Sequence, residues 1–468
     1  MPDPSSPSPP ATARGKVAII TLGCGRNDVD SDNVGGLLTV GGFDVVSDPD
    51  QADAVIVNTC TFIAPAREES IEVVLDACDT DRPVVVMGCM AERYGDDLAQ
   101  SIPEAAAVVG FGSYTDLPDI VARAIAGDGA PAVPSVALPA SERRGLPVLG
   151  TGPVGPDAPP TAAFPVRTMP RGPWAYLKIA GGCDRVCTFC SIPSFRGRFS
   201  SRPLEELEAE VRWLAEQGVR ELVCVSENTT SWGKDLPGGR HAQADLIAMF
   251  DRVEQLEMVR LMYLQPAEIT PVLLDAMAGS ATVVPYYDLS LQHASASVLD
   301  RMARSGSPER FLGLIEGIRR RDPEAVFRSS FITGFPGETE ADVQILMDFL
   351  ETAGLDWAGV FTYSVEDGTA AATMPDQVPA AEARARASAV TEVVEAVAQD
   401  KADAFVGRTL QMMVEGHEDG DVAVGRSHRE APETDGEIRV AGLGTPVGRF
   451  APVRIVDTDG IDLIGNPA

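Results

Sequence analysis

Short runs of consecutive apolar residues alternate with helical patterns over the first 128 residues of the chain. The runs KVAIIT, ADAVIV and PVVVMG are separated by stretches that predict helices, one from Ser31 and one over Pro65–Ala77. Continuous apolar runs between helices are typical of parallel strands that are covered on both faces. We therefore predict a parallel α/β domain over residues 15–128, preceded by a disordered tail over residues 1–14.

The same alternation resumes at residue 174 and continues to about residue 365. Helical patterns separate the runs, and one of them, PLEELEAEVRWLAEQG, has a proline near its start and a glycine at its end, as helices often do. Six strand–helix units in succession predict a partial (β/α) barrel over residues 174–378. The predicted strands are WAYLKIA, ELVCVSEN, VRLMYLQP, YYDLSLQH, VFRSSFITGFP and AGVFTYS.

Two segments connect these blocks to each other and to the C-terminus. Residues 131–173 contain 11 prolines among glycines and alanines, which predicts a linker or long loop over residues 129–173. A helix is predicted over residues 379–406. Residues 407–468 read as short strands with frequent Gly and Asp turns, which predicts a small β-barrel or sandwich. The predicted fold class is therefore a multidomain α/β protein with a C-terminal β module.

Composition limits the function. The formal net charge is −31, which argues against indiscriminate binding to nucleic acid, because phosphate binding requires lysine and arginine. The chain has no run of 18 apolar residues, and its N-terminus lacks the apolar core of a signal peptide. We expect no membrane association and a cytoplasmic location, where clustered cysteines more often bind metals than form disulfides.

Three cysteines lie close together in GGCDRVCTFC, at positions Cys183, Cys187 and Cys190. Closely spaced thiolates suit zinc or an iron–sulfur cluster, but a structural zinc site usually needs four ligands. The motif directly follows the first predicted barrel strand, and active sites of such barrels lie at the carboxyl ends of strands. A 4Fe–4S cluster with three thiolate ligands leaves one iron open for a substrate or cofactor. A zinc knuckle is the alternative.

Three further cysteines, Cys24, Cys60 and Cys89, each end an apolar run in the first block. The ends of parallel strands fall on one edge of a sheet, so these thiolates can converge although they are 36 and 29 residues apart in sequence. A second cluster with three thiolate ligands is our leading hypothesis, and buried structural cysteines are the alternative. We predict that Cys78 and Cys224 are packing residues.

The CxxxCxxC motif and its position resemble those of the radical S-adenosylmethionine (SAM) enzymes. The resemblance implies that the open iron binds the amino and carboxylate groups of SAM. It also implies that one electron cleaves SAM to a radical that abstracts hydrogen from a carbon. SSFITGFPGET, at the end of the fifth strand, and SEN, after the second, are expected to contact SAM. The expected SAM contacts are Phe189, Ser226, Glu227, Asn228, Gln292, Arg328, Gly334 and Pro336.

The pair of cluster motifs, followed by a β module, resembles the methylthiotransferases within that superfamily, over about residues 15–468. The resemblance implies a methylthiotransferase domain, a radical SAM barrel and a TRAM domain, with two 4Fe–4S clusters. The second cluster is expected to handle the sulfur atom. One SAM donates a methyl group, another yields the radical, and an electron donor such as flavodoxin or ferredoxin is required.

Two substrate classes occur in that family. TLGCGRNDVDSD and GRSHREAPETDGEI resemble RimO-type members, which modify the β-carbon of an aspartate in the twelfth protein of the small ribosomal subunit. The alternative is a MiaB-type enzyme, which modifies isopentenyl adenosine in tRNA. From Asp403 onward the chain has 12 acidic and 6 basic residues, a net charge of −6. Because an RNA-binding module should be basic, we expect a ribosomal-protein substrate rather than tRNA.

The acidic C-terminal module also leads to a more specific expectation. We expect the segment Gly425–Ile438 to help present a loop of the basic substrate protein. The alternative is that Arg426 and Arg429, within this segment, bind phosphate.

Overall fold

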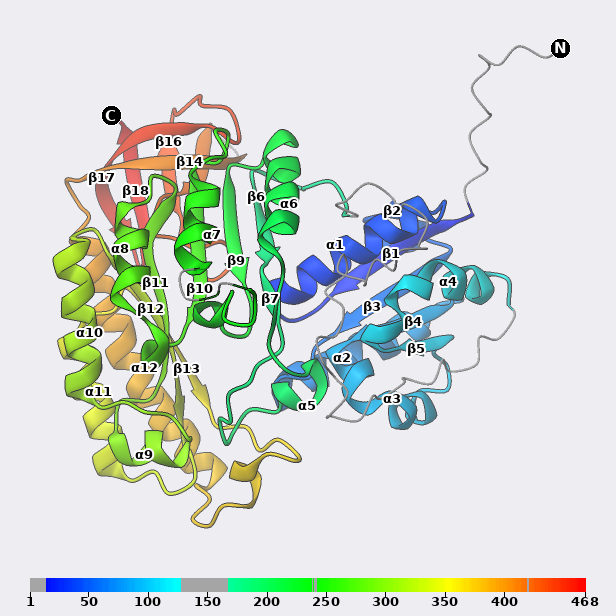
Figure 1. Cartoon of the computed structure of the whole chain (residues 1–468), viewed down its shortest axis with the longest axis horizontal. Helices are drawn as coiled ribbons and strands as arrows, with labels where there is room; N and C mark the ends of the chain where they lie inside the picture. The colour runs from blue at the N-terminus through cyan, green and yellow to red at the C-terminus, as the bar shows by residue number, and fades with distance from the viewer. Residues whose placement is uncertain (1–13, 128–166, 238, 240–241, 419–420) are drawn as a thin grey trace. The chain divides into compact units, whose positions relative to one another are not determined.

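The structure is a computed structural model that describes residues 14–127, 167–237, 239, 242–418 and 421–468 (Figure 1). The predicted tail up to residue 13 and the predicted linker up to residue 166 lie outside the described residues. The chain divides into two compact units. Unit 1 contains residues 1–168 together with Ser194–Gly197, and unit 2 contains Met169–Pro193 and Arg198–Ala468.

Unit 1 is built on a five-stranded parallel sheet with the order β2-β1-β3-β4-β5. Strands β3 and β4 are buried along their whole length, as their continuous apolar runs predict. The helix predicted from Ser31 begins earlier, at Gly25, because Cys24 is its extended N-cap residue. The elements are β1 (Lys16–Thr21), α1 (Gly25–Val40), β2 (Asp44–Val46), η1 (Pro49–Gln51), β3 (Ala54–Thr59), α2 (Ala64–Cys78), β4 (Val84–Gly88), α3 (Cys89–Ser101), β5 (Ala107–Val109), η2 (Phe111–Asp116) and α4 (Leu117–Ile125).

Unit 2 contains a six-stranded parallel sheet with the order β13-β12-β11-β10-β9-β6, in which β6 and β13 form the edges. Its strands are β6 (Trp174–Lys178), β9 (Glu221–Val225), β10 (Met258–Leu264), β11 (Val283–Gln292), β12 (Val326–Thr333) and β13 (Trp357–Thr362). A small antiparallel pair, β7 (Ala180–Gly181) and β8 (Ser200–Ser201), follows β6. The sheet is the partial barrel of six units that the sequence predicts.

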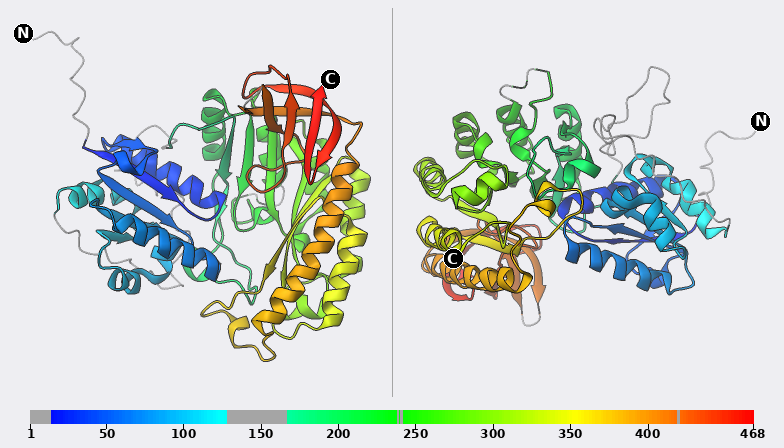
Figure 2. Two further views of the ribbon diagram at one scale, coloured as in Figure 1. Left: turned by 180° about the vertical axis from the view of Figure 1, so that it is seen from behind. Right: turned by 90° about the horizontal axis from the view of Figure 1, so that it is seen from below.

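The longer helices between these strands lie along the outer side of the curved sheet, as Figure 2 shows. The long α12 packs against β12, β13 and α11 and leads into the C-terminal barrel. The helices are α5 (Ile192–Arg196), α6 (Leu204–Glu216), η3 (Thr229–Ser231), α7 (Ala242–Phe250), η4 (Pro266–Glu268), α8 (Pro271–Gly279), α9 (Ala296–Arg301), α10 (Pro308–Arg321), α11 (Glu340–Ala353), η5 (Ala370–Thr373) and α12 (Ala380–Asp403).

The C-terminal part of unit 2 is a closed barrel with the strand order β14-β15-β16-β18-β17. Its interior is filled by apolar side chains such as Met412, Val440 and Val453, all fully buried. The predicted fold class is therefore confirmed, with a closed barrel rather than a sandwich at the C-terminus. No helix within the described residues is long and apolar enough to cross a membrane. The strands are β14 (Thr409–Glu418), β15 (Val422–Arg426), β16 (Ile438–Ala441), β17 (Phe450–Asp459) and β18 (Asp462–Pro467).

Candidate functional site

The three cysteines of unit 1 lie at the carboxyl ends of three neighbouring strands. Cys24 lies between β1 and α1, Cys60 directly follows β3, and Cys89 directly follows β4. Strands β1, β3 and β4 are adjacent in the sheet, so the three thiols share one edge. The strand ends thus meet as the sequence predicts, and the assignment of these thiols as cluster ligands stays a prediction.

The side chain of Asn27 connects all three strand ends. Its Nδ2 donates to the carbonyl oxygens of Leu22 and Thr59 at 2.7 and 3.2 Å, and the Cys89 Sγ lies 3.6 Å from its Oδ1. Glycine is required at position 23, because this position lies directly against the side chain of Cys60. A Cβ there would lie 3.0 Å from the Cys60 Sγ, and the φ of +101° disfavours any other residue. Sequence reasoning missed Asn27, although its place three residues after Cys24 was a usable signal.

Two arginines contribute positive charge to this group of thiols. Burial alone would raise the pKa of Cys24, but the charges of Arg26 and Arg196 outweigh burial and lower it. Burial raises the pKa of Cys60, and it raises that of Cys89 to about 11. The three thiols influence one another's ionisation, which places them within electrostatic reach of each other. Burial and the neighbouring thiols thus oppose ionisation of Cys60 and Cys89, and the charge of Arg196 favours it.

The cysteines of unit 2 lie on a loop that follows β7. The backbone N–H of Cys190 donates to the carbonyl oxygen of Cys187 at 3.2 Å, so the loop turns back on itself. Burial and the nearby charges of Glu227 and Cys187 raise the pKa of Cys183 to about 11, and backbone hydrogen bonding opposes this shift. Cys183 therefore lies within electrostatic reach both of Cys187 and of the end of β9.

The end of α9 holds this loop in place. Thr188 donates from its backbone N–H to the carbonyl oxygen of Met302 at 3.2 Å and from its hydroxyl to that of Arg301 at 2.8 Å. The guanidinium of Arg304 donates to the Cys187 Sγ at 3.5 Å and to the Gln265 Oε1 at 2.8 Å. Sequence reasoning missed Arg304, because 117 residues separate it from Cys187.

The two groups of thiols suit a cluster better than a single metal ion. Among the residues that the structure describes, no three His, Cys, Asp or Glu side chains are arranged to chelate one metal ion. The thiolates of a 4Fe–4S cluster bind different irons, so they do not need to meet at one point. Three thiols at three strand ends of unit 1 and three thiols on one loop of unit 2, each set beside a donor arginine, therefore suit two clusters that each keep one open iron.

Most of the predicted SAM contacts lie at the carboxyl ends of the strands of unit 2. Ser226, Glu227 and Asn228 directly follow β9, and Gln292 ends β11 with a φ of +73°. The Phe189 ring, on the cysteine loop, packs edge-on against Phe335, which follows β12, with centroids 6.5 Å apart. These residues stay predicted SAM contacts.

The loop after β12 is held by a buried carboxylate. Gly334 has a φ of +73°, and its N–H donates to the Glu338 Oε1 at 2.9 Å. Arg386, on α12, contacts the same oxygen at 3.0 Å, and the His293 Nε2 lies 3.4 Å from the Glu338 Oε2. Pro336 receives a hydrogen bond on its carbonyl oxygen from Arg301 at 3.4 Å. The buried His293 therefore belongs to the contacts that hold this loop.

A cavity of about 430 Å³ lies beside the cysteine loop and the end of β9. Glu268 lines it and accepts hydrogen bonds from Arg185, Lys234, Ser231 and Asn228. Burial opposes ionisation, but these donors lower the pKa of Glu268 to about 2. Glu268 thus joins the cysteine loop, through Arg185, to the strand end that carries the predicted SAM contacts.

We predict that Glu268→Gln destabilises the protein near neutral pH but not in acid. The folded pKa of about 2 lies below the usual 4.5, so the stabilising effect is present above about pH 4.5 and is lost as the pH falls toward 2. The expected loss at pH 7 is about 1 kcal/mol, because solvent partly screens the group. Urea unfolding at pH 7 and pH 3 measures it, with the exposed Glu254→Gln as the control. If the difference in unfolding free energy between Glu268→Gln and the wild type is as large at pH 3 as at pH 7, the prediction is wrong.

The structure places Arg328 away from the other predicted SAM contacts. It is the third residue of β12, and it pairs with Asp288 at 3.2 Å and with Asp435 of the C-terminal barrel at 3.6 Å. The amino end of a parallel strand lies opposite the edge where barrel active sites form. We therefore assign Arg328 to this ion-pair network and do not include it among the proposed SAM contacts.

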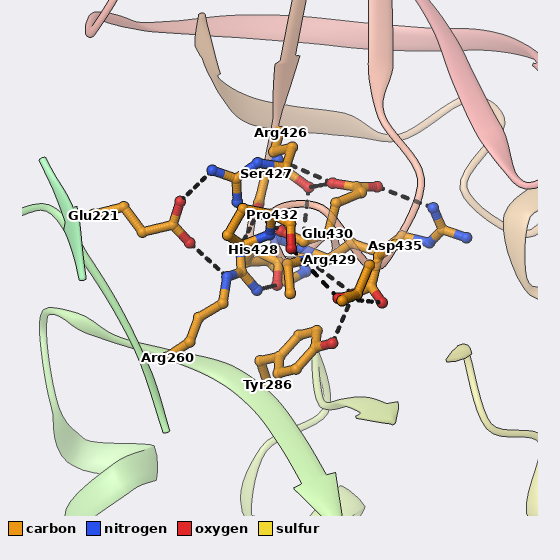
Figure 3. A network of polar contacts seen from close by, with 12 residues as sticks. Glu221, Arg260, Tyr286, Arg426, Ser427, His428, Arg429, Glu430, Pro432 and Asp435 are labelled. Carbon is orange, nitrogen blue, oxygen red and sulfur yellow. Dashed lines mark hydrogen bonds and ion pairs between the residues drawn. The ribbon is translucent and has the colours of Figure 1, made fainter. Parts of the chain in front are cut away.

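This network belongs to a segment of the C-terminal barrel, residues 426–435, which we call the plug segment (Figure 3). Arg426 pairs with Glu221 at the start of β9 at 2.6 Å, and Arg260 of β10 pairs with the same carboxylate at 2.6 Å. The Tyr286 hydroxyl of β11 donates to Asp435 at 2.6 Å. Burial alone would raise the pKa of Glu221, but the charges of the two arginines outweigh burial and lower it.

The plug segment contacts the remaining strands of the sheet as well. The Trp357 Nε1, at the start of β13, donates to the Arg429 carbonyl oxygen at 2.8 Å, and the Arg429 guanidinium lies over the Trp357 ring. On the opposite edge, the Tyr176 hydroxyl of β6 donates to Glu433 at 2.8 Å. Arg328 of β12 pairs with Asp435 of the plug segment, as described above. The plug segment therefore contacts all six strands of the sheet toward their amino ends.

These contacts narrow the expectation for the segment Gly425–Ile438 to its exposed part. Arg426, Ser427, Arg429 and Glu430 are at most 3% exposed. These four residues are therefore not available to present a loop of another protein, whereas Glu433 and Thr434 are exposed, so for that part of the segment the expectation stays a prediction. The alternative, that Arg426 and Arg429 bind phosphate, is wrong, because both guanidinium groups are buried in ion pairs.

Comparisons with known protein families match three parts of the chain. Residues 16–110 match a family described as uncharacterized protein family UPF0004, residues 177–350 match the radical SAM superfamily, and residues 406–467 match the TRAM domain. Among solved structures, the radical SAM methyltransferase TsrM from Kitasatospora setae has a TM-score of 0.51 at 16% identity. The alignment covers 93% of this chain and 84% of that one. At that identity the likeness concerns the fold alone.

Curated relatives match almost the whole chain. One from Kineococcus radiotolerans is 47% identical and covers 98% of this chain and 99% of the relative. Others, from Saccharopolyspora erythraea and Cutibacterium acnes, are 44% and 42% identical, and each covers 97% of this chain. All three are described as ribosomal protein uS12 methylthiotransferase RimO.

The fold and the cysteine-bearing loop define a radical SAM enzyme, which is confirmed by the match over residues 177–350. More narrowly, the chain belongs to the family of ribosomal protein uS12 methylthiotransferases RimO. The predicted family is thereby confirmed, and the predicted cofactors, 4Fe–4S clusters and SAM, are those of this family.

Proposed function

We propose that the chain transfers a methylthio group to the β-carbon of an aspartate in ribosomal protein uS12, the twelfth protein of the small subunit. The observation that carries this function is the presence of three cysteines at the carboxyl edge of each of two parallel sheets. The identity of 42 to 47% to uS12 methylthiotransferases over nearly the whole chain supports the same substrate.

The proposed ligands of the SAM-cleaving cluster are Cys183, Cys187 and Cys190, and those of the sulfur-handling cluster are Cys24, Cys60 and Cys89. When bound, the reduced cluster and SAM supply one-electron cleavage chemistry and the methyl group. The residues of the chain hold these groups. Arg304 and the end of α9 orient the loop of the first cluster, and Asn27 links the strand ends at the second.

We propose that SAM is bound at the carboxyl ends of β9, β11 and β12. The polar groups there are Ser226, Glu227, Asn228 and Gln292, and the turn Gly334–Pro336 offers its backbone. The positive φ of Gly334 lets the backbone approach a ligand closely. Phe189, next to Cys190 in sequence, offers an aromatic face for the adenine. The Glu268 contacts described above hold Asn228 in place.

A tRNA substrate is the second candidate, and it is disfavoured. The curated relatives carry the ribosomal-protein name, and the C-terminal barrel offers little positive charge, because two of its six basic residues, Arg426 and Arg429, are buried. Mass spectrometry of uS12 and of tRNA, from cells with and without the gene, tests the choice. A mass increase on uS12 that depends on the gene supports the proposal, and a dependent methylthio group on tRNA refutes it.

We predict that Cys24→Ala keeps reductive SAM cleavage but loses methylthio transfer. Cys24 has a lowered pKa and lies among the second set of thiols, apart from the loop of the SAM-cleaving cluster in sequence. Deoxyadenosine formation is expected to stay within about twofold of the wild type, whereas methylthiolated product falls to background. Cys78→Ala is the control, because Cys78 ends α2 away from the strand ends. Normal product from Cys24→Ala would make the site structural.

Two further parts of the proposal concern the cell. We place the enzyme in the cytoplasm, where thiols stay reduced and ribosomes are made. A small electron-transfer protein such as flavodoxin or ferredoxin is the proposed electron donor. Support for the donor comes from the chemistry alone, because SAM cleavage consumes one electron per event. Reconstituting activity with each purified donor in place of dithionite tests it.

A further inference from the structure

Arg196 is a buried cation at the edge of unit 1. It is the last residue of α5 and lies six residues after Cys190 in the sequence, but it belongs to unit 1 through the segment Ser194–Gly197. Its side chain is only 5% exposed. Burying a charged group is costly unless it is paired and hydrogen-bonded, so its contacts show which groups compensate it.

Its contacts converge on the second set of thiols. The Arg196 Nη2 donates to the Cys89 Sγ at 3.0 Å and to the Asn27 Oδ1 at 2.8 Å. Asn27 is the residue that links the three strand ends. The guanidinium also lies over the Phe111 ring, 5.1 Å from its centroid. The Arg196 Nη2 thus links Cys89, a proposed cluster ligand, to Asn27, whose side chain holds the other two strand ends.

The Arg196 guanidinium faces both a carboxylate and a proposed ligand thiol. The Asp30 Oδ2 lies 3.6 Å from the Nη2, beyond ordinary hydrogen-bond distance. In contrast, Cys89 accepts a direct hydrogen bond. A 4Fe–4S cluster with three thiolate ligands is an anion, and it becomes more negative on reduction. A nearby cation and an N–H···S hydrogen bond both stabilise the more negative state.

We infer that Arg196 is a positioning residue for the sulfur-handling cluster, which it anchors through Cys89 and Asn27 and whose reduced, more anionic state it stabilises. This inference rests on the proposed ligands Cys24, Cys60 and Cys89. It goes beyond the proposed function, because it assigns a role to a residue outside both cysteine motifs. It also means that the chain following the SAM-cleaving motif contributes a side chain to the other cluster.

The experiment isolates the second cluster. In a parent with Cys183, Cys187 and Cys190 replaced by alanine, Arg196→Met and Arg196→Lys are compared with Arg198→Met. Arg198 is a matched control because its side chain is 70% exposed and pairs with Asp184. Iron and sulfide per chain are measured after anaerobic reconstitution, and the midpoint potential is measured by titration followed by electron paramagnetic resonance. None of these readouts depends on methylthio transfer.

We expect Arg196→Met to lower the midpoint potential, Arg196→Lys to shift it less, and Arg198→Met to leave it unchanged. If Arg196→Met binds less than half of the iron of the parent, recovery of iron in Arg196→Lys supports the same role. Equal potentials in the parent and Arg196→Met, at equal iron content, overturn the inference. Equal defects in the Met and Lys variants also overturn it, because charge would then not matter. A parent that binds no iron refutes the ligand set and the inference with it.

Discussion

Replacing Cys183, Cys187 and Cys190 together with alanine is expected to abolish SAM cleavage and to remove half of the iron. The three thiols lie on one loop that is anchored by the end of α9, and the Arg304 guanidinium donates to Cys187. With two 4Fe–4S clusters bound, iron should fall from about eight to about four per chain. Deoxyadenosine formation should fall to the assay background, because the cluster that these thiols are proposed to hold supplies the electron that cleaves SAM.

The control is the pair of cysteines that the sequence assigns to packing. Cys224 lies within β9, is fully buried and belongs to the main apolar core of unit 2. Cys78 ends α2 and is half-buried. Cys78→Ala and Cys224→Ala should each keep the full iron content, with a modest loss of stability for the second variant. Undiminished deoxyadenosine from the triple variant, measured by chromatography, would refute the ligand assignment.

The second large effect is expected from Glu221→Ala, which should destabilise unit 2 by about 3–5 kcal/mol. Glu221 is completely buried and pairs with Arg260 and Arg426 at 2.6 Å each. Removing its carboxylate leaves two buried guanidinium groups without this partner. The variant should loosen the plug segment from the sheet, because Glu221 is the residue that links β9, β10 and β15.

Urea unfolding and hydrogen exchange measure this effect. The exposed pair between Arg439 and Glu418, at 2.9 Å, offers a matched control on the same small barrel. Arg439→Ala should cost about 0–1 kcal/mol, because solvent screens an exposed ion pair. Exchange should rise at the amino ends of the strands in Glu221→Ala and stay unchanged in Arg439→Ala. A loss below 1 kcal/mol in Glu221→Ala would show that the network contributes little.

The plug segment also changes the interpretation of sequence likeness in the C-terminal domain. The motif GRSHREAPETDGEI identified the family type correctly, and four of its polar residues, Arg426, Ser427, Arg429 and Glu430, are buried in an internal interface. Motif residues that are charged look exposed in a sequence, because arginine and glutamate are rarely buried unless paired. Here Arg426, Arg429 and Glu430 are paired with residues on the sheet or with each other.

Several features of the candidate site could be predicted from the sequence. CxxxCxxC is a local spacing, and the placement of Cys24, Cys60 and Cys89 after apolar runs follows from the rule that parallel strands end on one edge. Arg196, Arg304 and Asn27 were not predicted as members of the site. Arg304 reaches a thiol from 117 residues away, and Arg196 from 107 residues away, so no local pattern records the contact.

The sequence by itself determined the alternation of strands and helices, the two sets of three cysteines and the family. It could do so because apolar periodicity, short motif spacing and strand-end placement are properties of neighbouring residues. Only the tertiary structure decided which charged residues serve the site and which serve the core. Arg328 and Arg426 became parts of a buried network and Arg196 a partner of Cys89, because burial and pairing depend on contacts between residues far apart in the chain.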